Sequence, residues 1–205
     1  MRHLKPADYT VSTWSGGKTV QLAIGPEGAL YSDRNFLWRI SSATVELESS
    51  EFTALPDYER LIAPIRGEMA LSHNGGKEVL LRPYEVHRFD GADLTLSRGK
   101  CTDFNLMLRK GSVTGEMRAV FPGPQGKQRI TPDMLGDVTL LYLAEGSAVI
   151  RRGGDKLELL REEAVLLESR DCTKENVPGE EALELTFPEG QGGAIMMAAV
   201  RKARE

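Results

Sequence analysis

Histidine is scarce in this chain, whose 205 residues include only His3, His73 and His87. No two of them have the spacing of a His-x-His metal site, and the second half of the chain has none. Imidazole is a preferred protein ligand of transition metals, and too few such groups are present to assemble a centre. We therefore expect no metal and no cofactor, and metal-assisted or redox chemistry loses its support. His73 and His87 are expected in a turn or on the surface.

The sequence also lacks an excess of charge, a cysteine framework and a long apolar run. Its 26 basic and 30 acidic residues give no reason to expect a nucleic acid or a membrane surface as a partner. Cys101 and Cys172 are far apart and predict neither disulfides nor a zinc site. No apolar run approaches the roughly 20 residues that span a bilayer, and the N-terminus has no signal-peptide core. These absences predict a cytoplasmic protein.

What the chain does contain is a succession of short strand patterns. Valine, isoleucine, leucine and threonine alternate with polar residues, and Gly or Pro interrupts them about every ten residues. Residues 56–62 are the stretch in which we expect a short helical turn. The pattern predicts an all-β protein with a jelly-roll (double-stranded β-helix) fold.

An internal repeat divides the chain into two halves. Residues 67–89 align without a gap to residues 146–168 at a constant offset of 79. Residues 107–110 resemble residues 199–202 at an offset of 92. Because turns and side-chain pattern fix strand register, the gap-free match favours duplication over chance likeness. We predict two halves, 1–110 and 111–205, and the pattern of the repeat is similar to that of a cupin, so that two copies make a bicupin.

The loop at residues 14–19, WSGGKT, looks like the end of a phosphate-binding loop. Ser12 stands where that motif requires its first glycine, and residues 25–26, Gly-Pro, follow where a helix would have to run. A nucleotide site is therefore not expected. Gly16 and Gly17 are predicted in a tight turn between strands, with a second interpretation in which their N–H groups face an anion.

Five motifs are spaced along residues 5–112. They are the loop at 14–19; Trp38-Arg39-Ile40-Ser41-Ser42-Ala43-Thr44-Val45; Phe52 with Leu55-Pro56 and Arg60; Phe89-Asp90-Gly91; and Asp103-Phe104-Asn105-Leu106-Met107-Leu108-Arg109. In combination they resemble the HutD/Ves family, although the family loop, Trp-x-Asn-Gly-Gly-Gly-x-Thr, is longer than the loop of this chain. The resemblance implies a cytoplasmic bicupin that accompanies histidine degradation and restrains the pathway, by binding an intermediate such as formylglutamate. It implies no established enzymatic activity.

Polar residues in two predicted strands form the candidate ligand site. One face of the strand at 38–47 begins with Arg39 and Ser41 and continues with apolar residues, as expected for a barrel mouth that binds a ligand. The planar guanidinium of Arg39 suits a carboxylate. Asp103 and Asn105 share one face of the next polar strand, and the pattern leaves open whether that face lines the pocket or the seam between the halves.

A structural alternative remains for each of these residues. Asp103 could instead neutralise Arg39 or Arg60 inside the barrel, because a buried charge needs a partner. For Trp14 the alternative is a plug at one end of a barrel. The candidate ligand contacts are Trp14, Gly16, Gly17, Thr19, Arg39, Ser41, Arg60, Asp103 and Asn105, and no catalytic residue is predicted.

The leading hypothesis is a metal-free bicupin that binds a small anionic, formylglutamate-like metabolite in a regulatory or accessory role in histidine catabolism. A second is a metal-independent isomerase or amide hydrolase of a small carboxylate, with Asp103, Glu68 or Glu85 as the general acid or base. A third is a ligand-free module that dimerises through its sheet faces, and a homodimer stays open as the oligomeric state.

Overall fold

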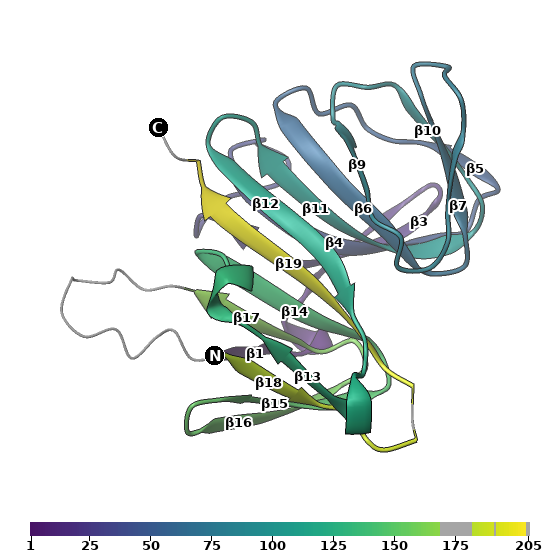
Figure 1. The fold of residues 1–205 in the computed structure, drawn as a ribbon. Coiled ribbons are helices and arrows are strands. Elements are labelled where there is room, and N and C mark those ends of the chain that lie inside the picture. Colours follow the sequence, from purple (N-terminus) through teal and green to yellow (C-terminus); the bar gives the residue numbers. More distant parts are fainter. Residues whose placement is uncertain (169–181, 191, 204–205) are drawn as a thin grey trace. The chain divides into compact units, whose positions relative to one another are not determined.

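The computed structural model describes residues 1–168, 182–190 and 192–203, and nearly all regular structure in them is β-strand (Figure 1). The predicted all-β fold is confirmed. Three short 3-10 helices are the helical elements, and none of the helices in these ranges has the length and apolar character to cross a membrane. Cys172 lies outside the described residues.

In chain order the strands are β1 (Arg2–Leu4), β2 (Thr10–Trp14), β3 (Gly17–Gly25), β4 (Trp38–Val45), β5 (Ser49–Glu51), β6 (Tyr58–Arg66), β7 (Met69–His73), β8 (Val79–Leu81), β9 (His87–Asp90), β10 (Thr95–Arg98), β11 (Cys101–Arg109), β12 (Val113–Val120), β13 (Lys127–Ile130), β14 (Val138–Glu145), β15 (Ser147–Arg152), β16 (Asp155–Leu160), β17 (Ala164–Glu168), β18 (Leu183–Thr186) and β19 (Ala194–Lys202).

The chain forms two compact units. The N-terminal unit comprises Asp8–Arg118 and the chain from Lys202, and the C-terminal unit comprises Met1–Ala7 and Ala119–Arg201. The chain passes from the first to the second within β12, shortly after the boundary predicted at residue 110. Strand β1 pairs antiparallel with β17, which explains why the first residues belong to the C-terminal unit.

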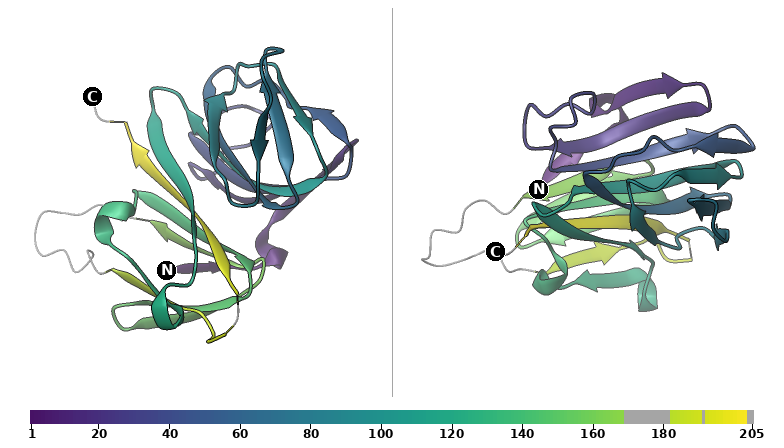
Figure 2. Two further views of the ribbon diagram at one scale, coloured as in Figure 1. Left: turned by 45° about the vertical axis from the view of Figure 1, so that its right-hand side comes forward. Right: turned by 90° about the horizontal axis from the view of Figure 1, so that it is seen from above.

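The N-terminal unit is a barrel of two sheets whose strands curl around one another (Figure 2, left). The sheets have the strand orders β2-β3-β4-β11-β6-β9 and β5-β10-β7-β8. In the C-terminal unit the corresponding orders are β1-β17-β14-β19 and β13-β18-β15-β16. Because side chains alternate across a strand, every second residue of each strand faces the barrel interior.

The helical turn predicted for residues 56–62 is wrong, since β6 begins at Tyr58 and pairs with β11 on one side and β9 on the other. Tyr58 and Ile62 are buried, and pairing on both edges outweighs the local preference for a turn after Pro56. Arg60 therefore lies within a central strand rather than after a surface turn.

Repeated strands pair in the same register in the two units. Arg60 of β6 lies opposite Met107 of β11, and Thr139 of β14 lies opposite Ala199 of β19. These four positions are related by the offsets of 79 and 92 found in the sequence. The sequence repeat thus corresponds to equivalent strand pairs.

The constant offset is wrong beyond the first hairpin turn of the repeat. An offset of 79 would match Leu80 with Leu159 and Leu81 with Leu160, yet Leu81 and Leu159 are buried while Leu80 and Leu160 are exposed. The buried pair is separated by 78 residues. A slip of one residue along a strand would turn every side chain to the opposite face of the sheet. The same side chains are buried in both units only because the two hairpin connections differ in length by one residue.

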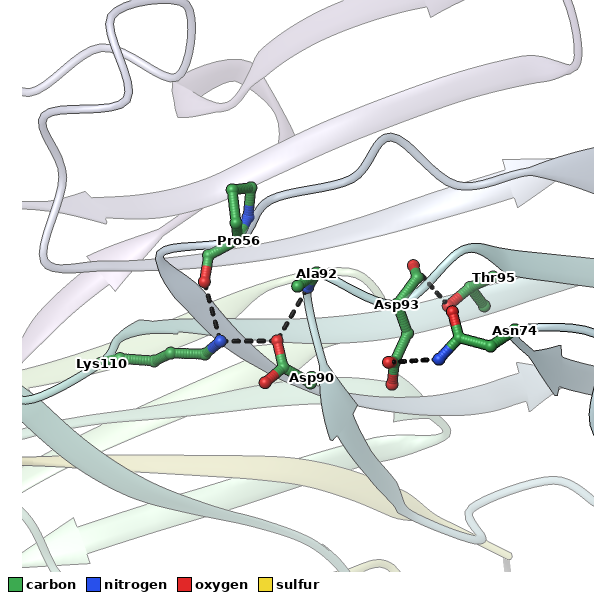
Figure 3. Close-up of polar contacts among 7 residues, drawn as sticks. All are labelled: Pro56, Asn74, Asp90, Ala92, Asp93, Thr95 and Lys110. Carbon is green, nitrogen blue, oxygen red and sulfur yellow. Dashed lines mark hydrogen bonds and ion pairs between the residues drawn. The ribbon is translucent and has the colours of Figure 1, made fainter.

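Polar side chains hold the connection between β9 and β10 in the N-terminal unit (Figure 3). Lys110 Nζ donates to the carbonyl oxygen of Pro56 at 2.7 Å and to Asp90 Oδ1 at 2.5 Å. Asn74 Nδ2 donates to Asp93 Oδ1 at 2.7 Å. The hydrogen bond from Lys110 is the main cause of a lowered pKa for Asp90. These contacts tie β9 and β10 to the ends of neighbouring strands.

Candidate ligand-binding site

The N-terminal unit encloses a pocket of about 250 Å³. It brings together all the predicted contacts except Gly16 and Gly17, and adds several residues from loops. The lining residues are Ser12, Trp14, Thr19, Tyr31, Arg39, Ser41, Ala43, Val45, Glu51, Phe52, Thr53, Arg60, Asp103, Asn105 and Met107.

Strand register explains why residues far apart in the sequence meet here. Arg39 of β4 and Arg60 of β6 are both paired with Met107 of β11, which lies between them. One step along the strands, Ser41 is paired with Asn105. Since alternate residues share a face, these side chains project from adjacent strands into the same pocket.

Strand β11 is buried on both faces, which decides the question that its pattern left open. Asp103, Asn105 and Met107 line the pocket, whereas Phe104 and Leu106 are fully buried on the opposite face. The two polar residues therefore face the pocket and not a seam between the halves.

Arg39 lines the pocket but is itself buried, whereas Ser12, Trp14, Glu51 and Thr53 of the same lining are exposed. The Arg39 side chain is only 5% exposed. Nε donates to Gln21 Oε1 at 2.8 Å, Nη1 donates to Ser41 Oγ at 3.1 Å, and the guanidinium lies 4.3 Å from the ring centre of Tyr31. Burial lowers the pKa of Arg39. Its partners are thus neutral groups and an aromatic face.

Arg60 is 6% exposed and lies over the rings of Phe52 and Phe89, at 4.7 and 5.1 Å. Its buried Nε has no hydrogen-bond partner within the described chain. Burial lowers its pKa to about 10, so the guanidinium remains charged at neutral pH. In the same residues, neither Arg39 nor Arg60 forms an ion pair with a carboxylate, so the internal salt bridge with Asp103, which the sequence left open as an alternative, is absent there.

Asp103 and Asn105 each present a buried oxygen, Oδ1, that has no hydrogen-bond partner in the described part of the chain. Burial raises the pKa of Asp103 to about 7, although attraction to Arg60, a backbone hydrogen bond from Ala43 and attraction to Arg39 oppose the rise. Near pH 7 the carboxyl group is therefore divided between its charged and neutral forms. In either form, the buried groups of the pocket carry a net positive charge.

The loop at residues 14–19 is the tight turn that the sequence predicts, between β2 and β3. A Cβ atom on Gly17 would lie 1.9 Å from the carbonyl oxygen of Thr44, and one on Gly16 would overlap the ring of Trp14. The close approach of the Thr44 backbone therefore requires glycine at position 17, whereas at Gly16 a side chain would displace the ring of Trp14. Trp14 and Thr19 line the pocket, whereas the glycines shape the loop beside it.

A family model and several solved structures match this chain. The HutD family model matches residues 6–185. The chain belongs to the HutD family. A conserved protein of unknown function from Pseudomonas aeruginosa PAO1 is 22% identical, with a TM-score of 0.81 and 98% coverage of both chains. HutD from Pseudomonas fluorescens SBW25, in its formate condition, is 20% identical, with a TM-score of 0.73 and 99% coverage of both chains.

A more distantly similar structure shares the cupin fold of this HutD-family chain. A cupin 2 conserved barrel domain protein from Leptotrichia buccalis is 9% identical, with a TM-score of 0.53, and the match covers 92% of this chain and 91% of that chain. At this level of identity the likeness concerns the fold alone. No curated protein matches the chain.

Tyr31 is a pocket residue that the sequence patterns did not identify in this HutD-family chain. It lies in the connection between β3 and β4, where its ring stacks on Phe36 at 6.0 Å, and Phe36 stacks on Tyr58 at 4.2 Å. The Tyr58 hydroxyl donates to the carbonyl oxygen of Arg34 at 2.8 Å. A loop has no periodicity, so the aromatic composition of residues 31–36 was the only available indication.

His73 and His87 meet in the N-terminal unit, where both side chains are half-buried. His73 ends β7 and begins the predicted turn, since the Gly76 N–H donates to its carbonyl oxygen, and His87 begins β9. Their Nε2 atoms are 2.9 Å apart, and His73 Nδ1 lies 2.9 Å from Thr95 Oγ1. Burial and the neighbouring His73 lower the pKa of His87. Across the described ranges, no three His, Cys, Asp or Glu side chains are grouped to hold a metal ion, so this pair does not fit the metal site typical of cupins.

Proposed function

We propose that this HutD-family cupin binds a small carboxylate-bearing metabolite in the pocket of its N-terminal unit. The observation that carries the proposal is that Arg39 and Arg60 are both buried beside a cavity and have no carboxylate partner in the described residues. An unpaired buried charge costs roughly 3–5 kcal/mol, and a bound carboxylate would offset part of that cost. Arg60 also has an unused Nε donor.

The two guanidinium groups suit different tasks in such a complex. Arg39 is already oriented by Gln21, Ser41 and Tyr31, so it loses little freedom when it binds an anion. Arg60 lies against two aromatic rings, and no hydrogen bond from its guanidinium is formed within the described residues, so its planar set of donors is available for a carboxylate, which can accept two parallel hydrogen bonds. The exposed Glu51 also lines the pocket, where water screens its charge.

We further propose a regulatory or accessory role in histidine catabolism, with a formylglutamate-like compound as the ligand. Membership of the HutD family supports this role. Isothermal titration against urocanate, formiminoglutamate, formylglutamate and glutamate tests it, and we expect at least one of them to bind. Folded protein that binds none of the four would contradict the assignment.

Variants of the two arginines test the pocket itself. Arg39→Ala or Arg60→Met should weaken carboxylate binding by roughly 1.5–3 kcal/mol, the usual contribution of a hydrogen bond to a charged group. Arg60→Met is the cleaner variant, because it orphans no hydrogen-bond partner in the protein. Arg151→Ala, at an exposed position of the C-terminal unit, is the matched control and should leave affinity unchanged.

The pKa of Asp103 favours a second candidate function, proton transfer in a metal-independent isomerase or amide hydrolase. A general acid or base works best with a pKa near the operating pH, and burial raises that of Asp103 to about 7. Turnover of a small carboxylate that Asp103→Asn abolishes, with binding retained, would support this function. An unchanged rate would remove Asp103 from the chemistry.

A further inference from the structure

We propose that the ligand of this pocket carries an N–H donor close to its carboxylate, and that Asp103 and Asn105 recognise this donor. The inference rests on the proposed function, because it specifies which carboxylates the pocket prefers. The inference concerns the hydrogen-bond acceptors of the pocket, whereas the two arginines explain only why the ligand is negatively charged.

Two buried acceptor atoms face the pocket without a donor. Asp103 Oδ1 and Asn105 Oδ1 have no hydrogen-bond partner among the described residues, although both side chains are at least nine-tenths buried. Leaving a buried acceptor unpaired is costly, and native proteins rarely retain two side by side without a role for them. A ligand made only of carboxylate and hydrocarbon would leave Asn105 Oδ1 unpaired at any pH.

Strand geometry sets the distance between the two parts of the ligand. Asp103 and Asn105 are alternate residues on one face of β11, and Met107, the next on that face, lies between Arg39 and Arg60. Alternate residues on a strand are about 7 Å apart. The anionic end therefore belongs at the arginine level. Asn105 lies one strand step from that level and Asp103 two steps, so Asn105 is the acceptor within reach of an amide or amine nitrogen a few bonds from the carboxylate, and Asp103 accepts from the far side of the donor group.

The experiment compares two probes that differ at one atom position. N-acetylglycine has an amide N–H beside its carboxylate, and levulinate replaces that N–H with CH2 while keeping the carbonyl group and the carboxylate. Titration calorimetry on the wild-type protein should show N-acetylglycine binding about tenfold more tightly or better, as expected for a hydrogen bond to a buried polar group. No variant is needed for this comparison, so folding defects cannot obscure it.

Variants then identify the acceptor. Asn105→Leu should reduce the preference for N-acetylglycine severalfold and leave levulinate affinity nearly unchanged, because the arginines remain. Thr10→Ala, at an exposed position of the same strand β2 that does not line the pocket, is the control and should preserve the preference.

The outcomes separate this inference from the proposed function. Equal affinities for the two probes would overturn the donor inference and leave the carboxylate pocket standing. Failure of N-acetylglycine to bind would also overturn the inference, even if another carboxylate binds. Failure of every carboxylate tested, with intact fold, would overturn both.

Discussion

The interiors of the two units differ although their strands pair in equivalent register. At matched inward positions, Asp103 and Asn105 of the N-terminal unit correspond to Ile195 and Met197 of the C-terminal unit. Within the described residues of the C-terminal unit, Thr139 is the one buried polar side chain, and its core is otherwise apolar. The comparison teaches that a few inward residues decide whether this strand framework encloses a dry core or a polar pocket.

The apolar interior of the C-terminal unit and the polar interior of the N-terminal unit differ in their effect on stability. An apolar interior gains about 25 cal/mol for each Å² of surface removed from water, whereas a buried charge without a partner loses free energy. The N-terminal unit retains Arg39, Arg60 and Asp103 in its interior in spite of that cost. Violations of the usual packing rules of this kind concentrate at functional sites.

The largest expected effect comes from placing the pocket carboxylate in the apolar unit. Ile195→Asp should lower the free energy of unfolding by roughly 3–5 kcal/mol, because the new carboxylate is buried without a partner. Urea denaturation measures the loss. Leu160→Asp, at a position that is 61% exposed in the same unit, should change stability by less than about 0.5 kcal/mol. If the Ile195→Asp variant were as stable as the wild-type protein, the two interiors would not differ in the way described.

Asp103 should also make the stability of the N-terminal unit depend on pH. Its pKa is about 7 in the folded protein against an ordinary 3.8, so the folded state binds its proton more tightly than the unfolded state does. Stability from this group is therefore complete below about pH 4 and falls as the pH rises to about 7, by on the order of 4 kcal/mol. Asp103→Asn should lack this component. Parallel pH profiles of unfolding free energy for the two proteins would contradict the prediction.

A smaller effect is expected when a pocket residue takes the identity of its counterpart. Asn105→Met should raise the free energy of unfolding by about 1–2 kcal/mol, because an unpaired buried acceptor is removed and the pocket has room for the longer side chain. Thermal unfolding measures the gain. A destabilised variant would mean that Asn105 holds the barrel together rather than serving a ligand.

The smallest effect concerns the loop that completes the pocket. Tyr58→Phe removes a hydroxyl that donates to the carbonyl oxygens of Arg34 and Phe36, and should cost about 1 kcal/mol of stability. Carboxylate affinity should fall modestly, because Tyr31 stacks on Phe36 and also covers Arg39. Unchanged stability and affinity would show that the aromatic stack alone positions the loop.

Sequence patterns predicted the framework of the molecule and seven of the fifteen residues that line its pocket. Alternation and turn residues predicted an all-β fold, the resemblance of the repeat to a cupin predicted a cupin-like barrel, and the motifs identified the HutD family. Arg39 and Ser41 were correctly placed on one inward face, because alternation along a strand is a local property. The helical turn at residues 56–62 was wrong, since pairing with distant strands overrode local preference. The contact between His73 and His87 could not be predicted, because it depends on the pairing of strands far apart in the chain.

The sequence by itself determined which residues alternate, which glycines the turns require and which family the chain belongs to. Only the tertiary structure decided that Arg39 and Arg60 lie on either side of Met107, that Asp103 faces them, and that a loop tyrosine covers one guanidinium. The physical reason is that strand alternation depends on neighbours in the chain. Pocket composition, burial and the resulting pKa values depend on the register between strands tens of residues apart.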